Sequence, residues 1–206
     1  MMVGAYRHHY FERYRQIAHL IPHGASVLDL CCGPGILYTR HLREKSVAYT
    51  GLDFNERFVH RVIRAGALGQ VRDLRSDEPL PPADYVVMQA SLYHFLPDPL
   101  PIFRRMLNAA RRAVIIAEPI HNLATSRLPV LSYLGAVMSN PGSGAQPNRF
   151  DEKSLDDFVR RSFDGSYSSA LMPGGREKVY ILNVPERPAT PLPVPYPTSA
   201  ISLYHD

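Results

Sequence analysis

The sequence has little cysteine and no long apolar run, and each shortage excludes a class of protein. Its two cysteines, Cys31 and Cys32, are adjacent. Neighbouring cysteines rarely pair, so a disulfide scaffold is excluded. Two thiols without a His or Cys pair at ligand spacing do not form a zinc site, and we expect no metal. This cysteine usage indicates a reducing cytoplasm.

Segments that would cross or enter a membrane are also missing. No stretch approaches the 18 or more apolar residues that a span needs, and the start, MMVGAYRHHYFERYRQ, lacks the apolar core of a secretory signal. The net charge of +4 over 206 residues is a mild basic excess. A nucleic-acid interface is better supported by a concentrated basic stripe. We therefore expect a soluble, cytoplasmic protein with no membrane span, and nucleic acid is disfavoured as a partner.

Short apolar runs alternate with helical patterns over the first 118 residues. The runs are apolar on both faces, as expected for a parallel sheet that helices cover on both sides. The expected strands are 27–30, 48–52, 70–74, 85–89 and 113–117, and the expected helices are 7–20, 36–44, 56–65 and 100–109. This alternation predicts an α/β fold with a doubly wound, mostly parallel sheet.

The regular alternation ends after Glu118. The stretch RFDEKSLDDFVRRSF predicts a helix that begins after Asp151, because an aspartate there can cap the first turn. Two further strands are expected, at 167–171 and 178–183, around the turn PGG. We find no internal repeat.

The predicted organisation is one domain over residues 1–184, followed by a proline-rich tail at 185–206. An insertion or lid at about 119–150 carries an apolar helix, which either covers a substrate or packs on the core or on a second subunit. A homodimer through 122–150 or through the tail is compatible with this pattern.

The stretch SVLDLCCGPGILYTRHL, residues 26–42, predicts a strand, a glycine-containing turn and a helix. In open parallel sheets ligands bind beyond the carboxyl ends of the strands. Glycines let a ligand approach the main chain closely, and the free N–H groups of the following helix point toward it. Dinucleotides and S-adenosylmethionine both use this arrangement.

Tyr38 and Asp29 are the residues that distinguish between these two ligands. In the dinucleotide fingerprint the third glycine lets the helix pack on the strand, and that position here is Tyr38, counted from Gly33 and Gly35. Asp53, at the end of the next strand, could bind a ribose of either ligand. Asp29 suits a cationic cofactor better than a pyrophosphate, although it could instead brace the turn.

At this point the sequence resembles the class I S-adenosylmethionine-dependent methyltransferases. The resemblance covers roughly residues 26–121, and the motifs fall in the family's order and spacing: VLDLCCGPG, YTGLDFN, VRDL, ADYVVMQASLYHFL and AVIIAEPIH. It implies a Rossmann-like sheet of seven strands with helices on both faces, S-adenosylmethionine as cofactor, and methyl transfer as the activity.

The resemblance places the first motif against the amino-acid part of the cofactor. Asp29 would lie near the methionine end, and Gly33 and Gly35 would present main chain to it. Cys31 departs from the family, because it stands where a glycine is usual. We expect ordinary negative φ at Cys31 and a thiol close to the ligand. Cys32 is expected to be a small buried side chain.

The later motifs would hold the nucleoside. The resemblance implies that Asp53 binds the ribose hydroxyls and Phe54 lies against the adenine. Asp73 would accept from the adenine amino group, and Leu74 would lie beside the ring. Gln89 would place its carbonyl near the amino-acid part.

A weak nucleophile would also need a base at the carboxyl ends of the fourth and fifth strands. His94 and His121 occupy such positions, with Tyr93 and Glu118 as neighbours. Either histidine could instead only hydrogen-bond a loop, and Glu118 could anchor a loop or meet substrate.

Three further residues are candidates for substrate contact. Arg149 could bind an anionic group of the substrate or lie on the surface. Tyr10 and Tyr14 share one face of the first expected helix, which could close over the methionine end or simply pack on the core.

We therefore expect a methyltransferase that acts on a small molecule. The tetrapeptide of the NPPY type that marks base and glutamine N-methyltransferases is absent, and QASL stands there. A non-catalytic cofactor-binding or scaffold protein and an RNA methyltransferase are the alternatives.

Overall fold

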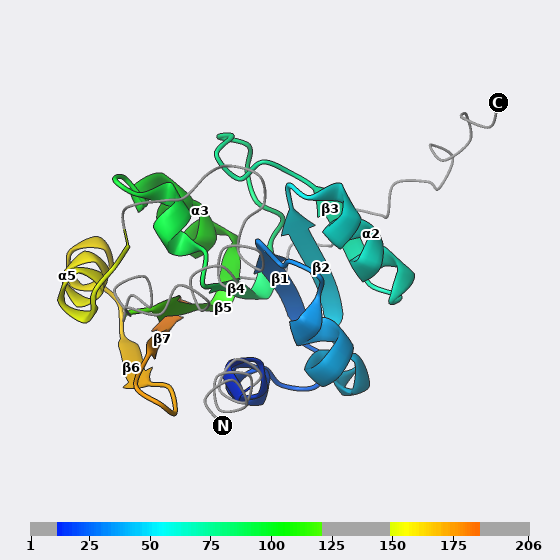
Figure 1. Cartoon of the computed structure of the whole chain (residues 1–206), viewed down its shortest axis with the longest axis horizontal. Helices are drawn as coiled ribbons and strands as arrows, with labels where there is room; N and C mark the ends of the chain where they lie inside the picture. Colours follow the sequence, from blue (N-terminus) through cyan, green and yellow to red (C-terminus); the bar gives the residue numbers. More distant parts are fainter. Residues whose placement is uncertain (1–11, 121–148, 186–206) are drawn as a thin grey trace, which may run out of the picture.

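The computed structural model describes residues 12–120 and 149–185, which form a seven-stranded sheet with helices on both sides (Figure 1). The strand order is β3-β2-β1-β4-β5-β7-β6. The strands are β1 (Ser26–Leu30), β2 (Ala48–Asp53), β3 (Leu68–Val71), β4 (Ala83–Gln89), β5 (Ala110–Pro119), β6 (Tyr167–Leu171) and β7 (Glu177–Asn183). All pairs are parallel except those that β7 makes with β5 and β6. The expected fold class is confirmed.

The helices lie close to where the sequence patterns predict them. The described α-helices include α2 (Glu56–Arg64), α3 (Leu100–Ala109) and α5 (Glu152–Ser162), and residues 12–20 are also α-helical. The helix expected at 36–44 is not a regular α-helix throughout. It contains a wider π-helix at Tyr38–Leu42, followed by a tighter 3₁₀ turn at Arg43–Lys45. A second 3₁₀ turn, η3 (Leu92–Phe95), follows β4.

Two predicted regions fall almost entirely outside the described residues. These are the insertion at about 119–150 and the tail at 185–206. The domain boundaries and the homodimer through either region therefore stay predictions. No helix in the described ranges is long and apolar enough to cross a membrane.

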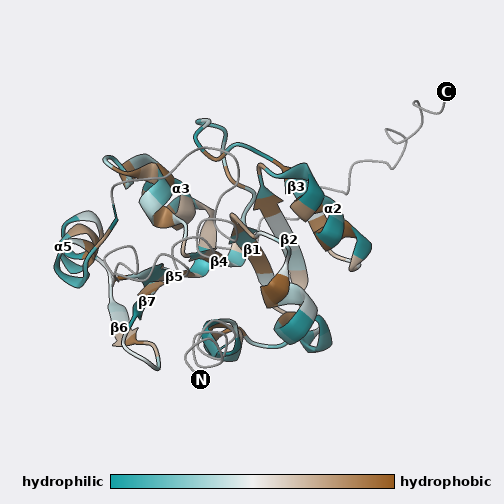
Figure 2. Cartoon of the chain, in the orientation of Figure 1, coloured by the Kyte–Doolittle hydropathy of each residue, from teal (hydrophilic) through white to brown (hydrophobic). Residues whose placement is uncertain are grey.

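The core consists of two apolar layers, one on each face of the sheet. Successive side chains of a strand point to opposite faces, and β5 shows this directly, because Val114 and Ile116 join one layer while Ile115 and Ala117 join the other. Helices α3 and α5 contribute to the first layer, and the helix of residues 12–20 lies across the sheet from them (Figure 1). The outer faces of α2 and α5 are hydrophilic, and the strands carry both hydrophobic and hydrophilic stretches (Figure 2).

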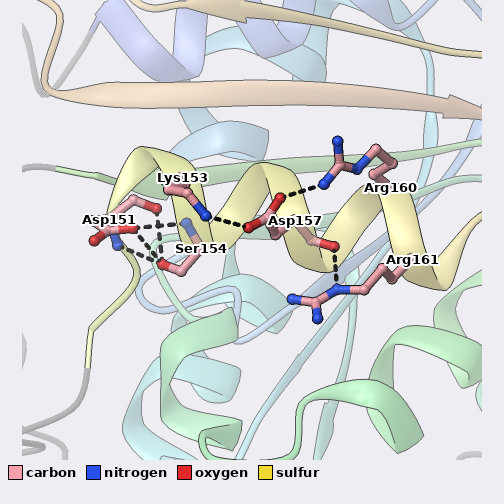
Figure 3. A network of polar contacts seen from close by, with 6 residues as sticks. All are labelled: Asp151, Lys153, Ser154, Asp157, Arg160 and Arg161. Carbon is pink, nitrogen blue, oxygen red and sulfur yellow. Dashed lines mark hydrogen bonds and ion pairs between the residues drawn. The ribbon is translucent and has the colours of Figure 1, made fainter.

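Helix α5 begins where the sequence predicts, and its first turn shows why. Asp151 accepts a hydrogen bond from the Ser154 N–H at 2.7 Å, and the Ser154 hydroxyl bonds the Asp151 N–H at 3.0 Å, which satisfies two N–H groups that would otherwise lack partners. Further along, Asp157 pairs with Lys153 and Arg160 (Figure 3). This face of α5 is a solvated surface of mutually paired charges.

The strand order reverses at β1, because β2 lies on one side of it and β4 on the other. In open α/β sheets, ligands bind at the carboxyl ends of the strands next to such a reversal. The motifs singled out in the sequence come together at this edge.

Candidate active site

The turn after β1 has three residues with positive φ: Cys31 (54°), Gly33 (54°) and Gly35 (72°). The two glycines serve different contacts. A Cβ at Gly33 would meet no atom within 4 Å, whereas a Cβ at Gly35 would lie 2.7 Å from Cγ2 of Val62 in α2. Gly33 therefore borders open space, and Gly35 lets α2 pack against the turn.

Cys31 corrects one expectation. Negative φ was expected there, and this prediction was wrong, since Cys31 adopts the left-handed conformation that glycine favours. Such a conformation costs a residue with a side chain roughly 1–2 kcal/mol. The turn keeps the backbone geometry of a glycine although a thiol is present. Burial raises the pKa of this thiol far above its ordinary value, so it stays protonated. Cys32 is buried, as expected.

Asp53 ties the end of β2 to the glycine turn. Its Oδ2 accepts from the Gly33 N–H at 2.9 Å, and its Oδ1 accepts from the Asn55 N–H at 2.8 Å. Burial raises the pKa of Asp53, and the two backbone hydrogen bonds oppose this rise. The next residue, Phe54, leaves 47% of its surface exposed. A carboxylate and an open aromatic ring thus stand side by side at the mouth of the crevice.

Asp29 is enclosed rather than open to the crevice. Its Oδ2 accepts a hydrogen bond of 2.6 Å from the hydroxyl of Tyr49 in β2. Burial raises the pKa of Asp29 to about 7, although the Tyr49 hydrogen bond and the charge of Arg13 act in the opposite direction. Asp29 therefore makes a structural contact, as one of the two expected roles requires. Contact between Asp29 and a cofactor stays a prediction.

The two residues expected after β3 differ in exposure. Asp73 is exposed, and its Oδ1 accepts from the Arg75 N–H at 2.9 Å. Leu74 is buried in the core, and its carbonyl accepts from Arg105 of α3 at 2.8 Å. These bonds fix the loop that follows the edge strand.

Glu118, near the end of β5, holds the loop after β4. It is fully buried, and its Oε1 accepts from the N–H groups of Ser91 (2.6 Å) and Leu92 (2.7 Å). Burial raises the pKa of Glu118 to about 7, against the effect of these hydrogen bonds. The Ser91 hydroxyl donates to the carbonyl of Gln89 at 2.8 Å. Of the two roles weighed for Glu118, the loop anchor is the one whose contacts are present.

Two buried oxygens at this edge have no hydrogen-bond partner among the described residues. They are Oε1 of Gln89, at the end of β4, and Oε2 of Glu118, at the end of β5. Buried polar atoms are nearly always paired in proteins. Such atoms are available to a bound molecule.

The loop after β4 presents an aromatic pair. The ring centroids of Tyr93 and His94 are 4.0 Å apart, and the Arg149 guanidinium lies 3.4 Å from the Tyr93 centroid. Burial, with the charges of Arg149 and Arg75, lowers the pKa of His94 to about 4. The imidazole is therefore neutral near pH 7.

The remaining predicted residues are divided between the core and the undescribed regions. Tyr14 is buried in the layer beneath the helix of residues 12–20, as the packing interpretation expects. Tyr10 and His121 lie outside the described residues. Residues 12–120 and 149–185 contain no group of three His, Cys, Asp or Glu side chains placed to hold a metal ion.

Sequence reasoning missed Arg13 and Tyr49. Arg13 is buried and donates to Oε1 of Glu177 in β7 at 2.7 Å, and its charge acts on both Asp29 and Glu118. Tyr49 holds Asp29. Arg13 belongs to no motif, and Tyr49 opens the motif YTGLDFN without a role assigned to it. Both contacts arise only when segments distant in sequence become adjacent.

Comparisons with known proteins agree with this geometry. A family model described as a methyltransferase domain matches residues 6–156, and the chain belongs to this family. The protein is an S-adenosylmethionine-dependent methyltransferase. No curated protein matches the sequence closely enough to count as a relative.

Solved structures share the fold at low sequence identity. One is magnesium protoporphyrin IX methyltransferase from Synechocystis PCC 6803 with bound SAH, at 14% identity and a TM-score of 0.62, covering 86% of this chain and 84% of that one. A TehB-like SAM-dependent methyltransferase from Corynebacterium glutamicum matches at 15% identity and a TM-score of 0.58, covering 85% and 88%. A third, from Haloferax volcanii, was solved in complex with the Trm112 methyltransferase activator (15% identity, TM-score 0.63, covering 89% and 93%).

Proposed function

We propose that this protein transfers the methyl group of S-adenosylmethionine to a small-molecule acceptor, at the carboxyl ends of β1, β2 and β4. The contact that carries the proposal is the hydrogen bond from the Gly33 N–H to Asp53. It sets a carboxylate beside a glycine that borders open space and beside the exposed ring of Phe54. A cationic cofactor with a ribose and an adenine needs these three features.

The nucleoside would be held by residues after β2 and β3. Asp53 uses one lone pair of each oxygen for Gly33 and Asn55 and can accept further bonds from ribose hydroxyls. Phe54 offers its exposed face to the adenine. Asp73 would accept from the adenine amino group, and the Leu74 backbone would lie beside the ring.

The amino-acid end would lie over the turn after β1. Gly33 gives close access to the main chain, and Gly35 keeps the turn packed on α2. The left-handed backbone of Cys31 lets the turn follow the same path as a glycine would. Asp29 contributes negative charge from below, and the unpartnered Oε1 of Gln89 is an acceptor for the amino group.

When bound, the cofactor supplies an already activated methyl group. The chain must then hold the nucleophile in line with the methyl group and exclude water, and such orientation can contribute about 7–11 kcal/mol to lowering the barrier. His94 is neutral near pH 7 and follows β4, so it is our candidate to accept the proton of an acceptor hydroxyl. Glu118 holds the loop that carries His94.

Other assignments complete the proposal. Tyr93 and Arg149 would contact the acceptor, and Tyr10 and His121 keep their predicted roles, whereas Tyr14 packs in the core. The domain over residues 1–184, with a lid at about 119–150 and a separate tail, stays our predicted organisation. The cytoplasm is the proposed compartment, supported by the two free cysteines.

The test uses the full chain and two measurements. Calorimetry is expected to show binding of S-adenosylmethionine and of S-adenosylhomocysteine, and a panel of small hydroxylated and aminated molecules is expected to include one that yields S-adenosylhomocysteine. Tight binding without turnover on any acceptor would contradict the small-molecule proposal.

A further inference from the structure

The guanidinium of Arg149 rests on an aromatic ring at the edge of the site. Its Cζ lies 3.4 Å from the centroid of Tyr93, which is itself only 3% exposed. Arg149 is exposed and stands two residues before Asp151, the cap of α5. This contact holds the guanidinium against the ring, and the exposed group keeps N–H donors for a planar oxyanion.

The charge of Arg149 is not neutralised within the described ranges. The other arginines include several held by acids, such as Arg13 by Glu177 and Arg160 by Asp157. Neither Arg149 nor Arg75 forms an ion pair with a described carboxylate, and Asp73 contacts only the main-chain N–H of Arg75. An arginine that rests on an aromatic ring and forms no ion pair with a described carboxylate can recognise an anion.

The charges of Arg149 and Arg75 both act on the imidazole of His94. Besides burial, the charges of Arg149 and Arg75 both lower the pKa of its imidazole. The nearest opposing charge is Glu118, which acts on Tyr93. Glu118 is fully buried and already accepts two main-chain hydrogen bonds, so it does not face the arginines from the solvent side.

These groups lie at the carboxyl edge of the sheet, on the acceptor side of the crevice. Arg75 follows β3, and Tyr93 and His94 follow β4. We call Arg75, His94 and Arg149 the arginine rim. The positive charges of this rim attract an anionic acceptor toward His94 and do not attract a neutral one.

We propose that the methyl acceptor carries an anionic oxygen group, a carboxylate or a phosphate, which Arg149 and Arg75 bind so that the nucleophile lies beside His94. This inference rests on the proposed function and adds the chemical class of the acceptor. Arginine suits this task because its planar fork matches two oxygens at once, and bonds between charged partners are the strong ones. Tyr93 is a positioning residue that holds the fork in place.

The test measures binding of matched ligand pairs to the full chain in excess S-adenosylhomocysteine, by ligand-observed NMR. The probes are 4-hydroxybenzoate against 4-hydroxybenzamide, and glycerol 3-phosphate against glycerol. We expect at least one anionic member to bind more tightly than its neutral partner, and the pair that responds tells carboxylate from phosphate. The Arg149→Gln variant should weaken that binding about ten- to a hundredfold, and Arg75→Gln by a smaller factor.

The control is Arg160→Gln on the outer face of α5, which removes the same charge at a residue paired with Asp157 (Figure 3). It should leave anion binding unchanged. Equal binding of charged and neutral members, no binding of either anion, or anion binding that Arg149→Gln leaves intact would each overturn the inference. Calorimetry with S-adenosylmethionine on the same samples separates the two proposals, because loss of cofactor binding in the wild type would instead contradict the proposed function.

Discussion

Gly33 donates its main-chain N–H to Oδ2 of Asp53 at 2.9 Å, and this bond joins the turn after β1 to the end of β2. The two residues come from adjacent parallel strands, and both border the open side of the crevice. The bond therefore sets the position of a carboxylate relative to the glycine turn before any ligand arrives. Such a preformed arrangement reduces the ordering that binding requires.

Replacing Asp53 by alanine is expected to weaken cofactor binding and to reduce stability. The change leaves the N–H groups of Gly33 and Asn55 without their acceptor, which costs about 1–3 kcal/mol for each buried group. Calorimetry should show a dissociation constant for S-adenosylmethionine at least about tenfold higher. Asp164→Ala, at an exposed aspartate between α5 and β6, is the matched control and should bind normally. Wild-type affinity in Asp53→Ala would remove Asp53 from the site.

Substitutions at the two glycines of the turn should fail in different ways. A Cβ at Gly33 meets no atom within 4 Å, so Gly33→Val should lose cofactor binding because it fills the space a ligand needs, and the positive φ there should also lower the free energy of unfolding. At Gly35 the added Cβ would lie 2.7 Å from Val62. Gly35→Ala should therefore lower the free energy of unfolding by about 1–3 kcal/mol.

Thermal unfolding and cofactor titration of both glycine variants distinguish these effects. Combining Gly35→Ala with Val62→Ala should recover part of the lost stability relative to Val62→Ala alone, since the clash is gone. If Gly33→Val bound S-adenosylmethionine normally, the open space beyond Gly33 would not be the cofactor site.

Removing the His94 imidazole is expected to slow turnover and to spare cofactor binding. His94→Gln should lower kcat by about 10²–10⁴-fold if His94 accepts the acceptor's proton. Because the pKa of His94 is lowered to about 4, the wild-type kcat should show no loss from this group between pH 6 and pH 8. His60→Gln, at an exposed histidine of α2, is the control. An unchanged kcat in His94→Gln would show that no base is needed there.

Glu118 should make the stability of the ligand-free protein depend on pH. Folding raises its pKa from 4.5 to about 7, so the folded state binds more protons than the unfolded state between these values. The contribution of Glu118 to the free energy of unfolding therefore falls as the pH rises from about 4.5 to about 7 and stays low above that. A neutral glutamine can still accept hydrogen bonds from Ser91 and Leu92.

We expect Glu118→Gln to match the wild type at pH 5 and to be more stable at pH 8, by on the order of 2 kcal/mol. Urea unfolding at the two pH values measures the difference, and Asp164→Asn should show no such change. A variant that is destabilised more at pH 8 than at pH 5 would mean that the ionised carboxylate is the favoured form.

Local features of the sequence were sufficient for most of the secondary structure. Strands apolar on both faces, and an aspartate before a helical pattern, depend only on neighbouring residues, so β1 and the start of α5 were placed almost to the residue. The same local reasoning failed at Cys31, because its side chain favours negative φ in isolation and the left-handed turn is imposed by the strands around it.

The candidate site was only partly predictable. The spacing of Asp29, Gly33 and Asp53 relative to their strands identified the cofactor crevice, since parallel strands end at one edge. Asp29 and Asp53 are both buried, and the groups that surround each carboxylate depend on how distant segments pack. That Tyr49 covers Asp29 could not be read from spacing.

The amino-acid sequence by itself determined the order of strands and helices, the glycine turn and the acids at the strand ends, because each of these follows from short-range periodicity and residue chemistry. Only the tertiary structure decided that Glu118 holds the loop after β4 and that Arg149 lies on Tyr93. Those contacts join segments that are far apart in the chain and meet only after the sheet has assembled. Burial in the assembled sheet then raises the pKa of Glu118, which no local pattern encodes.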